Sequence, residues 1–288
     1  KKSQMKALVG ILVLLVIGGI VLFQHNTRTD NIYPKETVLY KDNLKNIIDH
    51  VNVHAKTWKA GHNERWENMG LNAIKGQMGS FQGEGNPIKN MKIVDTEAED
   101  IPATFDAREQ WPKCDSIKEV RDQANCGSCW AFGAAEAMSD RVCIASGQTK
   151  QDRISSEDLL TCCGECGDGC EGGWPSAAWD YFQQTGLATG DLYGDDSWCL
   201  PYSFKPCDHH VQGKYGPCPD IAPTPDCTKT CNSSYKTKYE DDKHFASDSY
   251  GISSSVKAIQ TEIMTKGPVE AAFSVYEDFL AYKSGVYQ

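Results

Sequence analysis

Thirteen cysteines, all lying between Cys114 and Cys231, constrain this 288-residue chain more strongly than any other feature. Such a density is typical of a disulfide framework formed in an oxidising compartment. Because thirteen is an odd number, one thiol is left over if the other cysteines pair with one another. Sequence alone does not fix which cysteines pair, so the connectivity and the leftover thiol stay open at this point.

The overall composition narrows the class of protein. The formal net charge of −10 and the sequence pI of about 5.2 argue against a nucleic-acid partner, which needs a basic face. The same acidic balance suits a protein that works in an acidic compartment. Hydrophobic residues make up 40% of the chain, enough for a buried core in one or two domains. The change from a cysteine-free to a cysteine-rich sequence predicts a boundary near residue 100.

The N-terminus has the pattern of a secretory signal. A basic start is followed by an apolar run from Ala7 to Phe23. This pattern predicts a signal peptide over residues 1–26, with any residues before Met5 not native to the protein. A retained signal-anchor, which would attach the protein to a membrane, is the alternative, because the run is slightly short for a comfortable membrane span.

Periodicity and composition predict a mainly helical chain with long loops. Helices are expected over Val38–Trp58, Trp130–Cys143, Ser155–Leu160, Pro175–Gln184, Ser254–Lys266 and Glu277–Tyr282. Ser155 is the expected N-cap of its helix. The alternation of Pro268–Tyr276 predicts a strand, whereas residues 59–100 and 186–250 are expected to be loops.

Cys129 is the candidate nucleophile. It lies at the first turn of the helix predicted over Trp130–Cys143, and a helix N-terminus favours the thiolate, which is the form that attacks. Cys126 lies before the helix and is free to pair elsewhere. The plainer interpretation makes Cys129 one more half-cystine, but the leftover thiol, the helix start and the surrounding motif outweigh it.

The segment Cys126-Gly-Ser-Cys129-Trp130 matches the signature of papain and the cathepsins. Other segments resemble the cathepsin B type of this family: Thr57–Asn63, Phe105–Pro112, Cys162-Cys163, Gly167–Gly173, Cys207–His210 and Gly267–Tyr287. Several matches in the right order are hard to produce by chance. The sequence therefore resembles a cathepsin B-like cysteine protease over residues 38–288.

The resemblance implies a fold class and a domain order. The class is α+β, the papain-like two-domain fold, with the helical left domain complete and the β-barrel right domain mostly missing, preceded by a short helical propeptide. The implied order is a signal peptide over 1–26, an inhibitory propeptide over 27–100 and a peptidase domain over 101–288 that is incomplete at its C-terminus.

The resemblance also implies the chemistry of the site. Cys129 would attack a peptide carbonyl to form a thioester, and the side chain of Gln123 would help to bind the oxyanion. Gly172 and Gly173 would present backbone to an extended substrate, with a plain tight turn as the alternative. The expected partners are peptide and protein substrates, the chain's own propeptide and cystatin-like inhibitors, in a lysosomal or secreted location that includes a gut lumen.

The segment Cys207–Cys218 resembles the occluding loop of cathepsin B. At acidic pH, His209 and His210 would bind the C-terminal carboxylate of a substrate, so that dipeptides are released besides internal cleavage. Asp122 matches the residue that anchors this loop through His209. Tyr215 stands where the family has an arginine anchor, so we expect the loop to open more easily and to favour endopeptidase action.

The family's disulfide pattern implies six pairs and leaves Cys129 free. The pairs are Cys114–Cys143, Cys126–Cys170, Cys162–Cys227, Cys163–Cys166, Cys199–Cys231 and Cys207–Cys218. Zinc is the alternative use of the clustered cysteines and histidines, but disulfides are favoured in a secreted chain, so we expect no metal and no cofactor. Asn232-Ser-Ser is a sequon that predicts N-glycosylation.

No histidine occupies the expected position of the general base. In the family this histidine follows the nucleophile by roughly 130–150 residues, and the cysteine-rich insert moves the expected site past Gln288. We therefore expect the base and its orienting asparagine to be absent, and the chain as written to fold poorly and to lack protease activity. A non-catalytic, secreted protease-like binding protein or a truncated inactive form is the alternative function.

Overall fold

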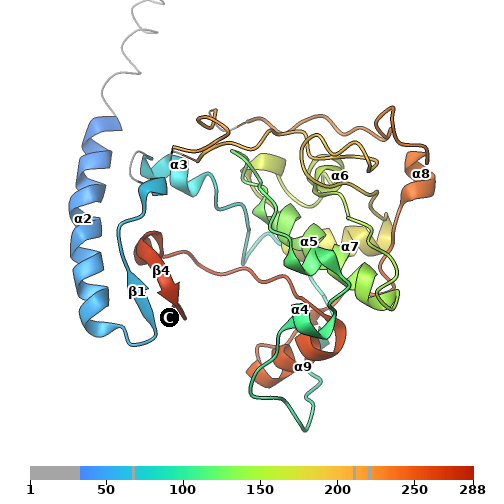
Figure 1. Cartoon of the computed structure of the whole chain (residues 1–288), viewed down its shortest axis with the longest axis horizontal. Helices are drawn as coiled ribbons and strands as arrows, with labels where there is room; N and C mark the ends of the chain where they lie inside the picture. The colour runs from blue at the N-terminus through green and yellow to red at the C-terminus, as the bar shows by residue number, and fades with distance from the viewer. Residues whose placement is uncertain (1–32, 67–68, 210–211, 220–221) are drawn as a thin grey trace, which may run out of the picture. The chain divides into compact units, whose positions relative to one another are not determined.

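The computed structural model describes residues 33–66, 69–209, 212–219 and 222–288 (Figure 1). The predicted signal peptide and His210 lie outside these residues. The chain divides into two compact units. One comprises the described residues up to Leu71 together with Glu277–Gln288, and the other comprises Asn72–Tyr276. This spatial division falls earlier than the change in composition near residue 100.

The smaller unit joins the two ends of the described chain. It contains α2 (Tyr33–His54), β1 (Trp58–Ala60), the 3₁₀ helices η1 (Glu64–Trp66) and η4 (Glu277–Ala281), and β4 (Tyr282–Gly285). The strands pair antiparallel, with Trp58 opposite Gly285. The helix predicted to reach Trp58 therefore ends at His54, because Trp58 is taken into this ladder and buried. The side chain of Asn52 exchanges hydrogen bonds of 2.9 and 3.1 Å with the backbone of Ala60.

The larger unit is centred on a buried helix, α5 (Cys129–Ala145). It packs against α6 (Ser156–Cys162) and α7 (Pro175–Gln184), and their apolar side chains form one core. The helix predicted over Pro175–Gln184 has the same bounds in the structure, where proline occupies the first turn, the position it tolerates best. Ser155 caps α6 as expected, accepting a hydrogen bond of 3.0 Å from the Asp158 N–H.

The remaining elements of the larger unit are short. They are α3 (Leu71–Lys75, starting at the unit boundary), β2 (Ile93–Val94), α4 (Ala107–Gln110), η2 (Asp115–Lys118), η3 (Gly169–Glu171), α8 (Tyr239–Asp242), β3 (Gly251–Ile252) and α9 (Val256–Lys266). Strands β2 and β3 pair in parallel, which fixes the segment before residue 100 beside the start of α9. The predicted helix over Ser254–Lys266 is thus observed from Val256, with Ser255 as its N-cap.

The predicted strand over Pro268–Tyr276 is wrong. Its backbone belongs to no ladder among the described residues, and most of its side chains are exposed. Alternating hydrophobicity makes a strand only where a partner strand supplies the hydrogen bonds, and the two described sheets lie elsewhere in the sequence. Helices and short strands together agree with an α+β class. In the described part of the chain, no helix has both the length and the apolar character needed to cross a membrane.

Six disulfides connect the larger unit: Cys114–Cys143, Cys126–Cys170, Cys162–Cys227, Cys163–Cys166, Cys199–Cys231 and Cys207–Cys218. These are the six pairs that the family resemblance implied. Cys129 is the free cysteine that remains, and it is half-buried. Cys129, the first residue of α5, therefore accounts for the odd number of cysteines.

Candidate active site

Cys129 is held at the N-terminus of α5 by a buried framework. Ser128, directly before it, is fully buried, and its hydroxyl lies 3.1 Å from the Tyr202 hydroxyl. The Ser128 carbonyl accepts hydrogen bonds from the first turn of the helix. On the other side, the Trp130 indole N–H donates to the Gly169 carbonyl at 3.1 Å. The sulfur of Cys129 therefore projects from a rigid helix start, where the helix dipole favours negative charge.

Gln123 lies beside the turn that leads into this helix. Its side-chain amide donates to the Cys126 carbonyl at 2.7 Å, and its own carbonyl accepts from the Tyr202 hydroxyl at 2.8 Å. The next residue, Ala124, has a positive φ of 53°, and its N–H donates to Asp122 Oδ1 at 2.8 Å. The structure thus brings Gln123 close to the Cys126–Cys129 turn, with its amide donor bonded to backbone.

A short segment from before residue 100 covers the sulfur of Cys129. The Gly79 N–H donates to Sγ at 3.1 Å, and the Ser80 hydroxyl lies 3.6 Å from the same atom. A Cβ at Gly79 would lie 1.8 Å from the Gly127 carbonyl oxygen, so only glycine fits this close approach. The sulfur faces an amide N–H, which is not an electrophile. Sequence reasoning missed this pair of residues, although the glycine-rich composition around them was a signal of close backbone approach.

Gly173 holds the same segment by strand-like pairing. Its N–H donates to the Gly79 carbonyl and its carbonyl accepts from the Phe81 N–H, both at 2.8 Å. Gly172 has a φ of 121°, and a Cβ there would lie 2.5 Å from the Phe81 ring. The Phe81 ring meets Trp174 edge-on, with centroids 5.5 Å apart. The two glycines therefore form the surface against which residues 79–81 of the same chain lie.

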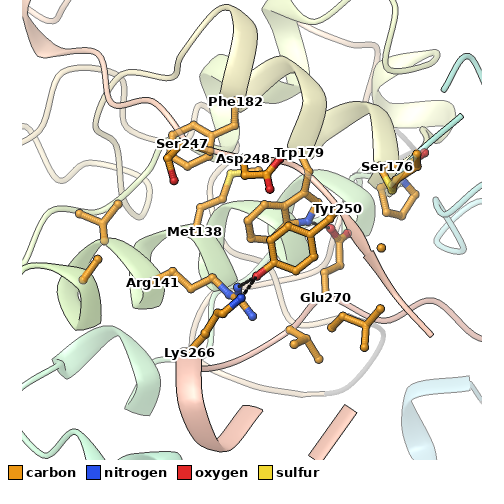
Figure 2. A pocket seen from close by; sticks show the side chains of 18 of the residues that line it. Met138, Arg141, Ser176, Trp179, Phe182, Ser247, Asp248, Tyr250, Lys266 and Glu270 are labelled. Atoms are coloured by element: carbon orange, nitrogen blue, oxygen red, sulfur yellow. Dashed lines mark hydrogen bonds between the residues drawn. The ribbon is translucent and has the colours of Figure 1, made fainter. Parts of the chain in front are cut away.

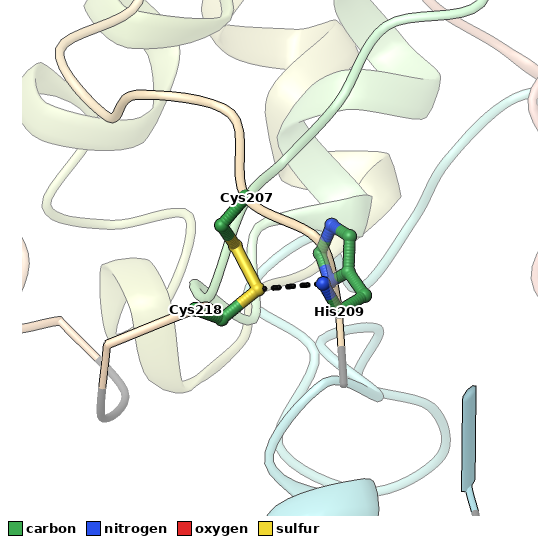
Figure 3. Close-up of side chains that lie close together, drawn as sticks. All are labelled: Cys207, His209 and Cys218. Carbon is green, nitrogen blue, oxygen red and sulfur yellow. Dashed lines mark hydrogen bonds between the residues drawn. A yellow bond between two sulfur atoms is a disulfide. The ribbon is translucent and has the colours of Figure 1, made fainter. Parts of the chain in front are cut away.

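The loop between Cys207 and Cys218 is attached to Asp122. His209 Nε2 lies 2.9 Å from Asp122 Oδ1, which also accepts from the Ala124 N–H. Figure 3 shows His209 beside the disulfide, where its backbone N–H donates to the Cys218 sulfur at 3.0 Å. Although these three residues have ligand-type atoms within 4.8 Å of one another, the two sulfurs are bonded to each other. The thiolates that a zinc site needs are thus not available.

The sequon residue Asn232 is engaged in the fold. Its amide nitrogen donates to the Trp198 carbonyl and approaches the Cys199 carbonyl at 3.4 Å. Its amide oxygen accepts from the Ser234 N–H at 2.9 Å. Glycosylation at Asn232 stays a prediction, and this bonding argues against it in the folded protein.

A separate pocket of about 840 Å³ lies against the C-terminal half of α5 (Figure 2). Glu270 lines it and accepts a 2.8 Å hydrogen bond from the Trp179 indole. Burial raises the pKa of Glu270 to about 8 in spite of that bond. Lys266 and Tyr250 also line the pocket, and the Lys266 ammonium donates to the Tyr250 hydroxyl at 3.1 Å. Cys129 does not line this pocket, so it is distinct from the site described above.

Comparison with known proteins gives the class. The model of the papain family cysteine proteases matches residues 101–288. A cathepsin B-like cysteine proteinase of Schistosoma japonicum is 46% identical over 248 residues, which cover 84% of this chain and 72% of the relative. Cathepsin B-like cysteine proteinase 6 of Caenorhabditis elegans is 48% identical over 256 residues, with 84% and 66% covered. The chain thus spans about two thirds of the length of one of these relatives and somewhat more of the other.

Solved structures agree with the sequence relatives. The procathepsin B S9 of Trypanosoma congolense superposes with a TM-score of 0.69 at 32% identity, covering 85% of this chain and 76% of that one. A digestive procathepsin L2 of Tenebrio molitor matches in fold, with a TM-score of 0.60 at 21% identity over 95% and 79% of the two chains. This chain therefore belongs to the papain family of cysteine proteases. Within that family it is cathepsin B-like.

Proposed function

We propose that this protein is the zymogen of a lysosomal or secreted cysteine protease in which the Cys129 sulfur attacks the substrate carbonyl. The observation that carries the proposal is a single free thiol at the first residue of α5, with an extended peptide lying against it. Attack forms a tetrahedral oxyanion, the amine leaves with a proton, and water hydrolyses the thioester. The Cys129 backbone N–H and the Gln123 side chain, once released from the Cys126 carbonyl, would bind the oxyanion.

Residues 27–100 act in this proposal as the inhibitory propeptide. Gly79 and Ser80 occupy the space in front of Sγ and pair with Gly173, the position that a substrate strand would take. Because the sulfur faces an N–H donor, the covering peptide is bound without being cleaved. Removal of the propeptide near Asp100–Ile101 would expose the same backbone to peptide substrates and to cystatin-like inhibitors.

A histidine base and an orienting asparagine complete the mechanism. Neither His209 nor His244 is assigned this role: they lie beside Asp122 and Asp152, at 2.9 and 3.0 Å, and among the described residues neither is a partner of the Cys129 sulfur. The Cys129 sulfur instead meets Gly79 and Ser80. We therefore expect the 288-residue chain alone to hydrolyse no peptide substrate, and the complete natural protein to do so.

The loop of residues 207–218 would add a peptidyl-dipeptidase activity. His209, held to Asp122, and its neighbour His210 would bind a substrate's C-terminal carboxylate in acid. That contact places the second peptide bond from the C-terminus at Cys129, so dipeptides are released.

The test uses the complete natural protein after acid processing. Parent enzyme is expected to cleave a fluorogenic peptide, and Cys129→Ala to lower kcat/KM by at least about a thousandfold, because the covalent route is removed. Ser80→Ala, in the part that processing removes, is the control and keeps full activity. Hydrolysis by Cys129→Ala would refute the proposal. Parent protein that binds peptides without cleaving them would favour the alternative, a secreted protease-like binding protein.

A further inference from the structure

The loop of residues 207–218 contains a buried carboxyl group that the proposed function does not use. Asp208 is 9% exposed, whereas its loop neighbours Gln212 to Tyr215 are exposed. Its Oδ1 accepts the Tyr215 N–H at 3.0 Å, and its Oδ2 accepts the Gly216 N–H at 2.6 Å. The Asp208 N–H in turn donates to the Gly216 carbonyl at 2.8 Å. Asp208, near the start of the loop, is thus joined to Tyr215 and Gly216, near its end, by three hydrogen bonds.

The local sequence is fitted to this arrangement. A Cβ at Gly213 would lie 2.4 Å from Asp208 Oδ1, so glycine leaves the space that the carboxyl group fills. The disulfide Cys207–Cys218 closes the loop one residue before Asp208 and two residues beyond Gly216. Hydrogen bonds from backbone N–H groups to an ionised carboxylate are about twice as strong as neutral ones. The loop is therefore closed by its own residues.

This closure sets the position of His209, the next residue. Its φ is 34°, in the left-handed region that residues other than glycine seldom adopt. Such a conformation persists only where the surroundings hold it. Here Asp208 fixes the backbone before it, the Cys218 sulfur accepts its N–H at 3.0 Å, and Asp122 binds its ring at 2.9 Å.

We propose that Asp208 is the positioning residue of the loop: it joins the start of the loop to Tyr215 and Gly216 and thereby aims His209 at Asp122 for the capture of a substrate's C-terminal carboxylate. This inference rests on the proposed dipeptide-releasing function. In this proposal Asp208 gives the loop its shape, and no basic residue is needed at position 215. The expectation that Tyr215 loosens the loop stays a competing prediction: if Asp208 sets the loop's shape, Tyr215→Arg leaves dipeptide release unchanged, whereas a loosened loop predicts that Tyr215→Arg raises it.

The test compares two activities in one preparation of the complete, processed protein. Asp208→Asn replaces one accepting oxygen by an NH₂ group that faces a backbone N–H. We expect dipeptide release to fall at least tenfold in kcat/KM, mainly through KM, while internal cleavage of a C-terminally blocked peptide stays within twofold. Gly213→Ala should act in the same direction. The control is Asp226→Asn, an exposed aspartate outside the loop, which changes neither activity.

Hydrogen exchange gives a second readout. The Tyr215 and Gly216 amides should exchange at least tenfold faster in Asp208→Asn than in the parent chain. Parent enzyme that releases no dipeptides refutes the proposed function of the loop, and this inference falls with it. If the parent releases dipeptides and Asp208→Asn does so equally, or if both activities fall in proportion, only the positioning role of Asp208 is refuted.

Discussion

Two stretches of the larger unit are ordered in different ways. Between Cys129 and Gln184, helices α5, α6 and α7 satisfy their own backbone and bury apolar side chains against one another. Between residues 187 and 250, the one described helix is the four-residue α8. There, buried polar side chains accept the backbone N–H groups, and disulfides join the loops. A stretch with no periodicity can therefore have a fixed fold.

Asp158 and Asp242 show how the loops are held. Asp158, on α6, accepts the Ala188 N–H at 2.8 Å and the Tyr239 hydroxyl at 2.9 Å. Asp242, at the end of α8, accepts the Thr189 N–H at 2.7 Å and the Tyr235 hydroxyl at 2.6 Å. Burial raises the pKa of Asp158 even though these donors act against it. Removing either acceptor leaves buried donors unpaired, which costs more than the bond contributes.

The largest expected effect comes from breaking a disulfide of the loop-rich stretch. Replacing Cys199 and Cys231, which have a sequence separation of 32, by alanine should lower the free energy of unfolding by about 3–4 kcal/mol, since a long loop is freed in the unfolded chain. The comparison is Cys163–Cys166, with a sequence separation of 3, where the same loop entropy gives less than half that loss. Urea unfolding measures both. Equal losses would show that loop length does not govern stability here.

The next effect concerns Asp242. Asp242→Asn should cost about 2–3 kcal/mol, because at least one of its charge-assisted hydrogen bonds is lost inside the fold. Asp241→Asn alters the exposed neighbour and is expected to change stability by less than about 0.5 kcal/mol. Thermal unfolding of the two variants side by side decides the matter. A loss in both, or in neither, would contradict the role given to the buried acceptor.

A pH effect links the two stretches. Burial raises the pKa of Glu136 to about 7 and those of Asp140 and Asp191 to about 6, near Arg121 and its neighbouring charges. The pKa values of these three carboxyl groups are higher in the folded than in the unfolded state. Their contribution to the free energy of unfolding is therefore complete below about pH 4 and is lost as pH rises through 6 to 7. We expect the urea midpoint to fall between pH 5 and 7.5. Glu136→Gln should flatten that fall, and a midpoint that rises with pH would refute the assignment.

The smallest effect separates two helix caps. Ser255→Ala should cost about 1 kcal/mol, because it removes the cap of α9. Ser155→Ala should cost more, since this buried hydroxyl caps α6 and donates to the Leu200 carbonyl at 2.7 Å, whereas the second partner of the Ser255 hydroxyl is the exposed Glu97 carboxylate. Circular dichroism melts of both variants test the order. The reverse order would mean that the Leu200 contact adds nothing.

The same comparison explains what the sequence could predict. The helix over Pro175–Gln184 was predictable because its first-turn proline and apolar spacing are local signals. The position of Cys129 at a helix start followed from the composition of the residues after it. By contrast, Asp242 meets Thr189 across 53 residues, and Gly79 meets Cys129 across 50. Contacts between residues so far apart in the sequence produce no periodic pattern from which they could be predicted. The strand prediction over Pro268–Tyr276 failed for a related reason, since alternation does not say whether a partner strand is present.

The central claim is that Cys129 is the free thiol of this site. The most direct test is to alkylate the native chain with iodoacetamide without reducing agent and to map the label by mass spectrometry. We expect one label per chain, on Cys129, with the twelve other cysteines protected. Labelling should be faster when Gly79→Ala displaces the covering segment. A label on any other cysteine, or none on Cys129 after the segment is displaced, would contradict the claim.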